Sequence, residues 1–217
     1  MNLEQARFNM VEQQIRPCEV LDQNVLDLMS AVRREDFVPA AYRNLAYADT
    51  EIPLGNGAAM LPPRIEAQAL QALALKKHEK VLEIGTGSGF MAALLAAHAD
   101  QVWSIEVAPA LADRARENLR NAGIGNVAVE TGDGLRGLSA HAPYDVIVVS
   151  GAVTEISEEL LAQLKVKGRL FAIVGQVPVM EAVLVTRVAE QSYSRVNLFE
   201  TAADYLKGGA AKPAFKL

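Results

Sequence analysis

The chain lacks the features that mark secreted and membrane proteins. Its 217 residues contain a single cysteine, Cys18, so no internal disulfide can form, and this cysteine usage favours a cytoplasmic protein. No apolar run approaches the about 20 residues of a membrane span, and the polar segment 1–8 does not look like a signal peptide. We therefore expect a protein that neither crosses a membrane nor depends on disulfides.

An excess of basic residues is missing as well. The chain has 21 Lys and Arg against 26 Asp and Glu, with a formal net charge of -5, which argues against nucleic acid as a partner. The three histidines, His78, His98 and His141, fall in no motif, and no metal site is predicted. The hydrophobic share of 51% is enough for one domain with a full core.

One glycine-rich segment is the most informative feature that is present. Residues 81–90 read Val-Leu-Glu-Ile-Gly-Thr-Gly-Ser-Gly-Phe, which predicts a buried strand, a tight turn and the start of a helix. A ligand at such a turn meets unpaired N–H groups at a helix N-terminus. We therefore predict a cofactor site around Gly85, Gly87 and Gly89.

Two kinds of cofactor use turns of this kind. The dinucleotide pattern G-x-G-x-x-G fails from Gly85, although it fits from Gly87 when Ala92 takes the last position. Glu83 favours the other kind, because an acid two places before the first glycine repels a pyrophosphate and suits the cationic amino end of S-adenosylmethionine. With this acid, the segment resembles the first motif of class I methyltransferases.

Two later carboxylates fit the same site. Glu106 ends a strand-like stretch about 20 residues beyond the glycine turn, where a ribose-binding acid is expected. Asp133, in Gly132-Asp133-Gly134, stands where class I methyltransferases place an acid that receives the adenine amino group. An Asp-Gly turn alone is common, but three signals in this order support one another. The predicted cofactor-binding residues are Glu83, Ile84, Gly85, Thr86, Gly87, Ser88, Gly89, Glu106, Val107, Asp133 and Gly134.

The apolar pattern of the whole chain predicts an α/β fold. Helices are expected near 3–16, 23–32, 64–75, 89–98, 109–122 and 155–165, and strands near 81–84, 101–106, 126–130, 144–149, 169–174, 181–189 and 193–199. This alternation favours a doubly wound, Rossmann-like sheet of the class I methyltransferase type, with an antiparallel edge hairpin and an N-terminal helical extension. Residues 33–63 are expected to be irregular.

A division of the chain follows from the same pattern. Residues 1–75 are predicted to form an N-terminal helical cap with the acceptor loop, and residues 76–207 the S-adenosylmethionine-binding core, within one structural domain. The last ten residues, 208–217, contain Gly-Gly, Ala-Ala and Lys-Pro and are predicted to be a flexible tail.

Further segments make the chain resemble one family in particular, the protein-L-isoaspartate O-methyltransferases. These segments keep the order of the family over roughly residues 8–200. They are Met10–Ile15, Val32–Pro39, Leu45–Asp49, Ile52–Gly57, Val81–Gly89, Gly132–Gly134, Ala142–Asp145 and Leu164–Leu170. The resemblance implies S-adenosylmethionine as cofactor, S-adenosylhomocysteine as product, and an isoaspartyl carboxyl of a protein or peptide as acceptor, in the repair of damaged proteins.

One loop departs from the family. Where the family has Gln-Thr-Ile-Ser-Gln-Pro, residues 58–63 read Ala-Ala-Met-Leu-Pro-Pro, so Leu61 occupies the position of the family's active-site serine. The substrate-loop candidates are Asn56, Gly57, Ala58, Met60 and Leu61, and no catalytic residue can be assigned. A buried acceptor carboxylate would need backbone N–H groups or a cation, for which Arg64 is considered, although a solvated helix residue is the commoner role.

The altered loop leaves three functions open. The first is isoaspartyl methylation, predicted to be weak or absent because Leu61 offers no hydrogen bond. The second is methyl transfer to a more apolar acceptor, in keeping with Met60 and Leu61. The third is a non-catalytic S-adenosylmethionine-binding protein that acts through partners.

Overall fold

The structure, a computed structural model, describes residues 2–210 and contains one large and one small β-sheet. The large sheet has seven strands in the order β5-β4-β3-β6-β7-β8-β9. Strands β3 to β7 are parallel, and β8 and β9 form an antiparallel hairpin at one edge. Its strands are β3 (Lys80–Ile84), β4 (Gln101–Glu106), β5 (Val127–Thr131), β6 (Tyr144–Val153), β7 (Leu164–Gln176), β8 (Val179–Ala189) and β9 (Ser192–Thr201).

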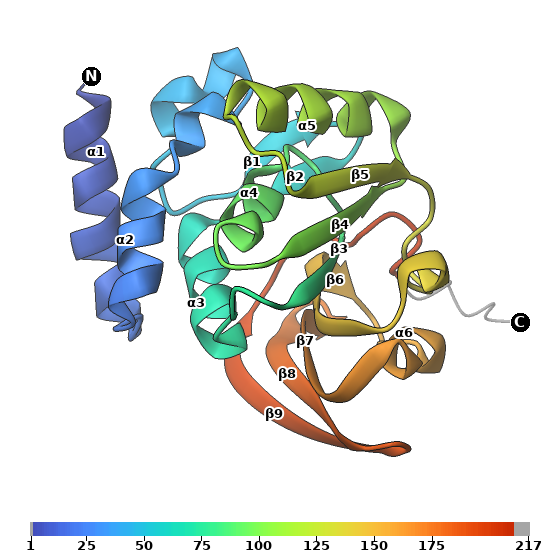
Figure 1. Cartoon of the computed structure of the whole chain (residues 1–217). Coiled ribbons are helices and arrows are strands. Elements are labelled where there is room, and N and C mark those ends of the chain that lie inside the picture. The colour runs from blue at the N-terminus through green and yellow to red at the C-terminus, as the bar shows by residue number, and fades with distance from the viewer. Residues whose placement is uncertain (1, 211–217) are drawn as a thin grey trace, which may run out of the picture.

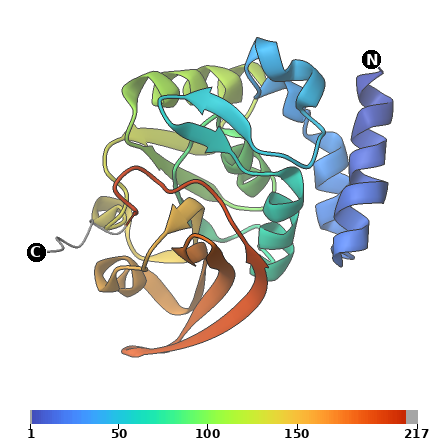
Figure 2. The ribbon, with the colours of Figure 1, turned by 180° about the vertical axis from the view of Figure 1, so that it is seen from behind.

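The helices cover both faces of this sheet, as Figures 1 and 2 show from opposite sides. Successive residues of β3 point to opposite faces, so Val81 joins the core cluster under α3, α4 and α5, whereas Leu82 joins the cluster under α6. The predicted doubly wound α/β fold is therefore confirmed, with its antiparallel edge hairpin and N-terminal helices. The helices are α1 (Leu3–Met10), α2 (Gln23–Ala31), α3 (Pro63–Leu73), α4 (Phe90–Ala96), α5 (Pro109–Asn121) and α6 (Glu158–Ala162).

The helix starts follow from local sequence. Asp22 caps α2 by accepting from the N–H of Asn24 at 2.9 Å, and Pro63 and Pro109 occupy the first turns of α3 and α5. Two predicted helices differ in extent. The first continues beyond α1 as a π-helical segment and a 3₁₀ turn to Cys18, and the one predicted over 155–165 is only α6, because β7 already begins at Leu164.

The stretch predicted to be irregular contains a β-hairpin. Strands β1 (Ile52–Gly55) and β2 (Ala58–Met60) pair antiparallel, and 3₁₀ turns at Arg34–Asp36 and Ala40–Leu45 precede them. The turn residues Asn56 and Gly57 have φ of 55° and 75°, the positive values that a tight two-residue hairpin turn requires. The Asn-Gly pair is therefore a sequence signal for a hairpin. The two strands that it connects are too short to show the apolar–polar alternation of a longer strand.

After β9, the chain returns across the carboxyl ends of the central strands as the segment 203–209, which we call the strap (Figure 2). The strap is held to β6, because Ala152 donates to the carbonyl of Asp204, and Leu206 donates to the carbonyl of Ala152, both at 2.9 Å. Farther along, Thr154 donates to the carbonyl of Gly209 at 2.8 Å. The predicted flexible tail, 208–217, lies outside the described residues from 211 onward.

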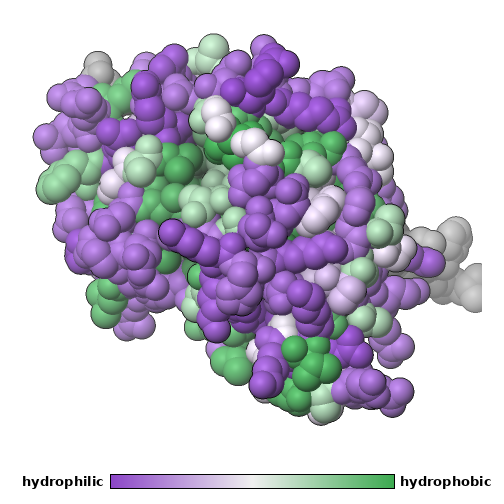
Figure 3. All heavy atoms as spheres, in the orientation of Figure 1, coloured by the Kyte–Doolittle hydropathy of each residue, from purple (hydrophilic) through white to green (hydrophobic). Residues whose placement is uncertain are grey.

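The outer face seen in Figure 3 is largely hydrophilic, with hydrophobic residues in smaller patches. Within residues 2–210, none of the helices combines the length and the apolar content that a bilayer span requires.

Candidate functional site

A cavity of about 270 Å³, which we call the main cavity because the predicted site residues line it, lies at the carboxyl ends of β3, β4 and β6, between the β1–β2 hairpin and the strap. Ligands of open α/β sheets bind at this edge. Many of the residues predicted from the sequence meet in its wall. They are Ile84, Gly85, Gly87, Glu106, Val107, Asp133 and Gly134 from the cofactor set, and Asn56, Gly57, Ala58 and Leu61 from the substrate loop.

The other predicted residues lie elsewhere. Glu83, Thr86, Ser88 and Met60 line a much smaller inner cavity beside the main one. Gly89 lines neither cavity and begins α4 with φ of 86°, and a Cβ there would lie 3.3 Å from Leu119 Cγ. Its role in the structure is therefore close packing of the turn against α5.

The glycine turn brings backbone to the cavity surface. Gly85 has φ of 90°, and a Cβ on it would lie 2.7 Å from Leu206 Cδ2 of the strap. A Cβ on Gly134, which also lines the cavity, would lie 2.4 Å from Ile105 Cγ2. Because a real Cβ does not tolerate such distances, larger residues at either position would shift the walls of the cavity.

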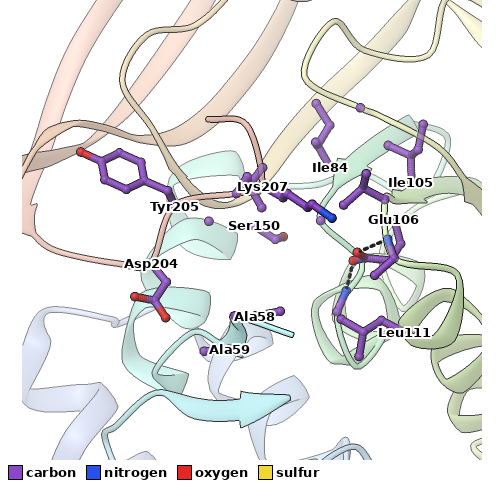
Figure 4. A pocket seen from close by; sticks show the side chains of 18 of the residues that line it. Ala58, Ala59, Ile84, Ile105, Glu106, Leu111, Ser150, Asp204, Tyr205 and Lys207 are labelled. Carbon is purple, nitrogen blue, oxygen red and sulfur yellow. Dashed lines mark hydrogen bonds between the residues drawn. The ribbon is translucent and has the colours of Figure 1, made fainter. Parts of the chain in front are cut away.

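Glu106 fixes the shape of the turn. Its carboxylate accepts from the N–H of Gly87 at 2.9 Å and from the N–H of Ala108 at 3.0 Å (Figure 4). The N–H groups of Gly89 and Phe90 are also bonded, to Thr86 O at 2.8 Å and Ser88 Oγ at 3.3 Å. The N–H groups of the glycine turn that were expected to be unpaired are therefore mostly hydrogen-bonded within the protein. Few of them are left to bind a pyrophosphate.

The charge of the cavity is negative. Four carboxylates line it, those of Glu51, Glu106, Asp133 and Asp204, against one lysine, Lys207. Figure 4 shows Glu106 and Asp204 on opposite sides, with the Lys207 side chain reaching in from the strap. Burial raises the pKa of Glu51 above its ordinary value. Such a wall suits a cationic ligand such as a sulfonium and disfavours a phosphate.

Glu83 is fully buried and held by hydroxyl groups. Ser150 donates to its Oε1 at 2.9 Å and Ser104 to its Oε2 at 2.5 Å, while Thr86 lies 2.6 Å from Ser104. Burial raises the pKa of Glu83 to about 8, although both serines oppose the shift. The sequence offered no motif for either serine, because each becomes a partner of Glu83 only through strand pairing.

The segment Ala58–Leu61, which we call the lid, lies beside the main cavity. Ala58, Ala59 and Leu61 line the main cavity and carry no side-chain donor. Leu61 is also a core residue, 8% exposed, and its carbonyl accepts from Arg34 Nη2 at 2.6 Å. Arg64, considered as a cation for the acceptor, instead pairs with Asp49 at 3.1 Å and does not line the cavity.

The strap contains the site residues that the sequence did not reveal. Asp204, Tyr205, Leu206 and Lys207 line the cavity although they lie about 120 residues beyond the glycine turn. No local motif marks them, since they reach the site only because the chain returns after the edge hairpin. No group of three or more metal-ligating side chains is found in the part of the chain that the structure describes.

The buried Glu83 makes stability depend on pH. In the folded protein the pKa of Glu83 is about 8 against an ordinary value of 4.5, so the fold holds a proton that the unfolded chain releases between these values. The stabilisation from this proton is fully present below about pH 4.5 and is lost as the pH rises through 8. We expect Glu83→Gln to flatten the fall in unfolding free energy from pH 5 to 8, at most about 1.4 kcal/mol per pH unit.

Urea denaturation at several pH values measures this effect. Asp113→Asn is the matched control, because the Asp113 side chain is 77% exposed and its loss should leave the slope unchanged. A Glu83→Gln variant with the slope of the unmodified protein would contradict the assignment.

Comparison with known proteins adds independent evidence. Residues 5–202 match the family model of protein-L-isoaspartate(D-aspartate) O-methyltransferase. The chain is 47% identical over 169 residues to the protein-L-isoaspartate O-methyltransferase of Methanoculleus marisnigri, covering 78% of this chain and 77% of that relative. It is 43% identical over 187 residues to the enzyme of the same name from Syntrophus aciditrophicus, covering 86% of each.

Solved structures share the fold. A protein-L-isoaspartate O-methyltransferase structure matches with a TM-score of 0.79 and 25% identity, covering 94% of this chain and 66% of that chain. A Plasmodium falciparum protein described as a putative protein-L-isoaspartate O-methyltransferase, in complex with S-adenosyl-L-homocysteine, matches with a TM-score of 0.80 and 19% identity. The match covers 95% of this chain and 99% of that chain.

Proposed function

This chain belongs to the protein-L-isoaspartate(D-aspartate) O-methyltransferase family, and from that premise we propose how its cavity supports methyl transfer. The chain is an S-adenosylmethionine-dependent methyltransferase. The proposal rests on one observation, the acidic main cavity. In it, Glu106 holds the glycine turn through a hydrogen bond from Gly87, and residues of the lid and of the strap line the wall.

We assign the cofactor to the glycine-turn side of this cavity. Glu106 keeps free lone pairs beyond its two backbone bonds and is positioned to accept from the ribose hydroxyls. Asp133, whose carboxylate accepts from the N–H of Leu135 at 3.0 Å, would face the adenine. When bound, S-adenosylmethionine supplies a methyl group on a positively charged sulfur.

We assign the acceptor to the side of the cavity formed by the lid and the strap. Methylating a carboxylate needs no strong general base, because a carboxyl with a pKa near 4 is already ionised at neutral pH. The protein has to orient the acceptor oxygen and offset the cost of removing it from water. With Ala58, Ala59 and Leu61 in the lid, these tasks fall to backbone groups and to Lys207.

A protein or peptide carboxyl is the acceptor class that the family supports, with isoaspartyl as its named form. A cytoplasmic location fits the single cysteine.

The assignment of Glu106 gives a direct test. We expect Glu106→Ala to weaken binding of S-adenosylhomocysteine by about 1–3 kcal/mol, because a hydrogen bond to a charged group is lost and the turn at Gly87 loses its anchor. Isothermal titration calorimetry measures the change. Asp204→Asn is the control, since Asp204 lies on the opposite side of the cavity, and its affinity should stay close to that of the unmodified protein. Equal affinities for Glu106→Ala and the control would refute the assignment.

A further inference from the structure

One charged side chain lies completely buried beside the lid. Arg34 is 0% exposed and is the largest fully buried side chain within residues 2–210. Burying a guanidinium costs free energy, and the Nε of Arg34 forms no hydrogen bond within the same residues. Because an apolar residue of similar volume would avoid this cost, the arginine is of use chiefly through the groups that its other atoms hold.

Those groups come from three different elements. Arg34 Nη1 donates to the carboxylate of Glu66 in the first turn of α3. Arg34 Nη2 donates to the carbonyl oxygen of Leu61 in the lid at 2.6 Å. The guanidinium carbon lies 4.7 Å from the centre of the ring of Phe90, which follows Gly89 and opens α4. Arg34 therefore links the lid to the helix that begins at the glycine turn.

The 3₁₀ turn that carries Arg34 is fixed by other contacts as well. Glu35, the next residue, is 5% exposed and accepts from the hydroxyl of Tyr47. Phe37 packs edge-to-face on Phe90, with the ring centres 5.5 Å apart. Because none of these contacts uses the Arg34 side chain, we expect the turn to keep its place when that side chain is replaced.

The lid depends on its backbone to contact an acceptor, because Ala58, Ala59 and Leu61 carry no side-chain donor. We propose that Arg34 is a positioning residue for methyl transfer. Through the carbonyl of Leu61 it fixes the lid backbone relative to the glycine turn, and the lid backbone then orients the acceptor. This inference rests on the proposed function, which assigns the acceptor to the side of the cavity formed by the lid and the strap.

A second buried arginine supplies a matched control. Arg169 pairs with Glu79 at 2.7 Å and also donates to the carbonyl oxygens of Leu73 and Ala74. Its side chain is 16% exposed, and neither Arg169 nor Glu79 lines the main or the inner cavity. Arg169 thus resembles Arg34 in its bonds to one carboxylate and to backbone carbonyls, but it holds the end of α3 opposite to the lid.

The first readout is amide hydrogen exchange of the lid. Arg34→Lys keeps the positive charge for Glu66 but loses the planar fork that reaches Glu66 and Leu61 together. We expect exchange of residues 58–61 to become about tenfold faster or more, because a hydrogen bond from a charged donor is lost. Arg169→Lys should leave exchange of this segment unchanged. Mass spectrometry measures both variants, with β3 and β4 as the reference for global unfolding.

The second readout is turnover at saturating S-adenosylmethionine. Methyl transfer to an isoaspartyl peptide should fall about tenfold or more in Arg34→Lys, because a displaced lid misplaces the acceptor. The affinity for S-adenosylhomocysteine should change little in this variant. In Arg169→Lys, both quantities should stay close to those of the unmodified protein.

Equal lid exchange in Arg34→Lys and Arg169→Lys would overturn the proposal, as expected if Arg34 serves stability alone. If Arg34→Lys does not fold, the double variant Arg34→Met with Glu66→Leu removes the bond to the lid without leaving a buried charge, and the same comparison of exchange decides. If the unmodified protein bound no S-adenosylhomocysteine, the proposed function would fail, whereas lid exchange would still report whether Arg34 holds the lid.

Discussion

On an isoaspartyl peptide, we expect turnover about a hundredfold or more below that of a family member with serine at the position of Leu61. When a hydrogen-bond donor points at the charge of the transition state, its removal lowers the rate by a factor of this order. The lid residues Ala58, Ala59 and Leu61 offer no side-chain donor, and the carboxylates of Glu51 and Asp204 line the same cavity and repel an anionic acceptor.

The measurement is methyl transfer from labelled S-adenosylmethionine at saturating cofactor, with methanol release after mild base as the signature of ester formation. The serine-containing family member, assayed on the same peptide, is the reference. Comparable turnover by the two enzymes would mean that backbone groups and Lys207 suffice to hold the carboxylate, and the prediction would be wrong.

Arg34→Ala is expected to lower the free energy of unfolding by about 3–5 kcal/mol, because it leaves the carboxylate of Glu66 buried without its cation. Both side chains are almost completely buried, and Arg34 also holds the carbonyl of Leu61 and stacks on Phe90. The double variant Arg34→Met with Glu66→Leu should recover much of the loss, since an apolar pair leaves no unpaired charge.

Urea denaturation provides the comparison. Arg136→Ala serves as control, because Arg136 and Glu159 are 83% and 59% exposed and exposed pairs contribute only about 0–1 kcal/mol. If Arg34→Ala lowers the free energy of unfolding as little as Arg136→Ala does, the buried Arg34–Glu66 pair does not anchor the lid to the core.

The sheet could be predicted from the sequence because its parallel strands are short apolar runs separated by amphipathic helices. The stretch 101–106 was predicted as a strand with the bounds that β4 has in the structure. The ends of helices and strands could not be predicted as closely. At Leu164, for example, α6 gives way to β7 because Leu164 pairs with Tyr144 of β6, and this pairing is not visible in the local sequence.

The candidate site was predictable where its residues share a motif and not where the fold brings them together. Glu83, Glu106 and Asp133 lie within or just after apolar stretches that the sequence marks as strands. Their roles toward the cofactor stay predictions. Ser150, Lys207 and the Arg34–Glu66 pair have no local signature. Arg34 and Glu66 lie 32 residues apart and form a site only through the packing of α3 against the segment before β1.

We propose that the cofactor half of the site is that of the family and that the lid limits isoaspartyl methylation. Replacing residues 58–62 by Gln-Thr-Ile-Ser-Gln tests it directly, with isoaspartyl methylation and S-adenosylhomocysteine affinity measured on the same preparation. We predict that methylation rises about tenfold or more while the affinity stays nearly constant. A folded variant that keeps its cofactor affinity and gains no isoaspartyl methylation would contradict the account.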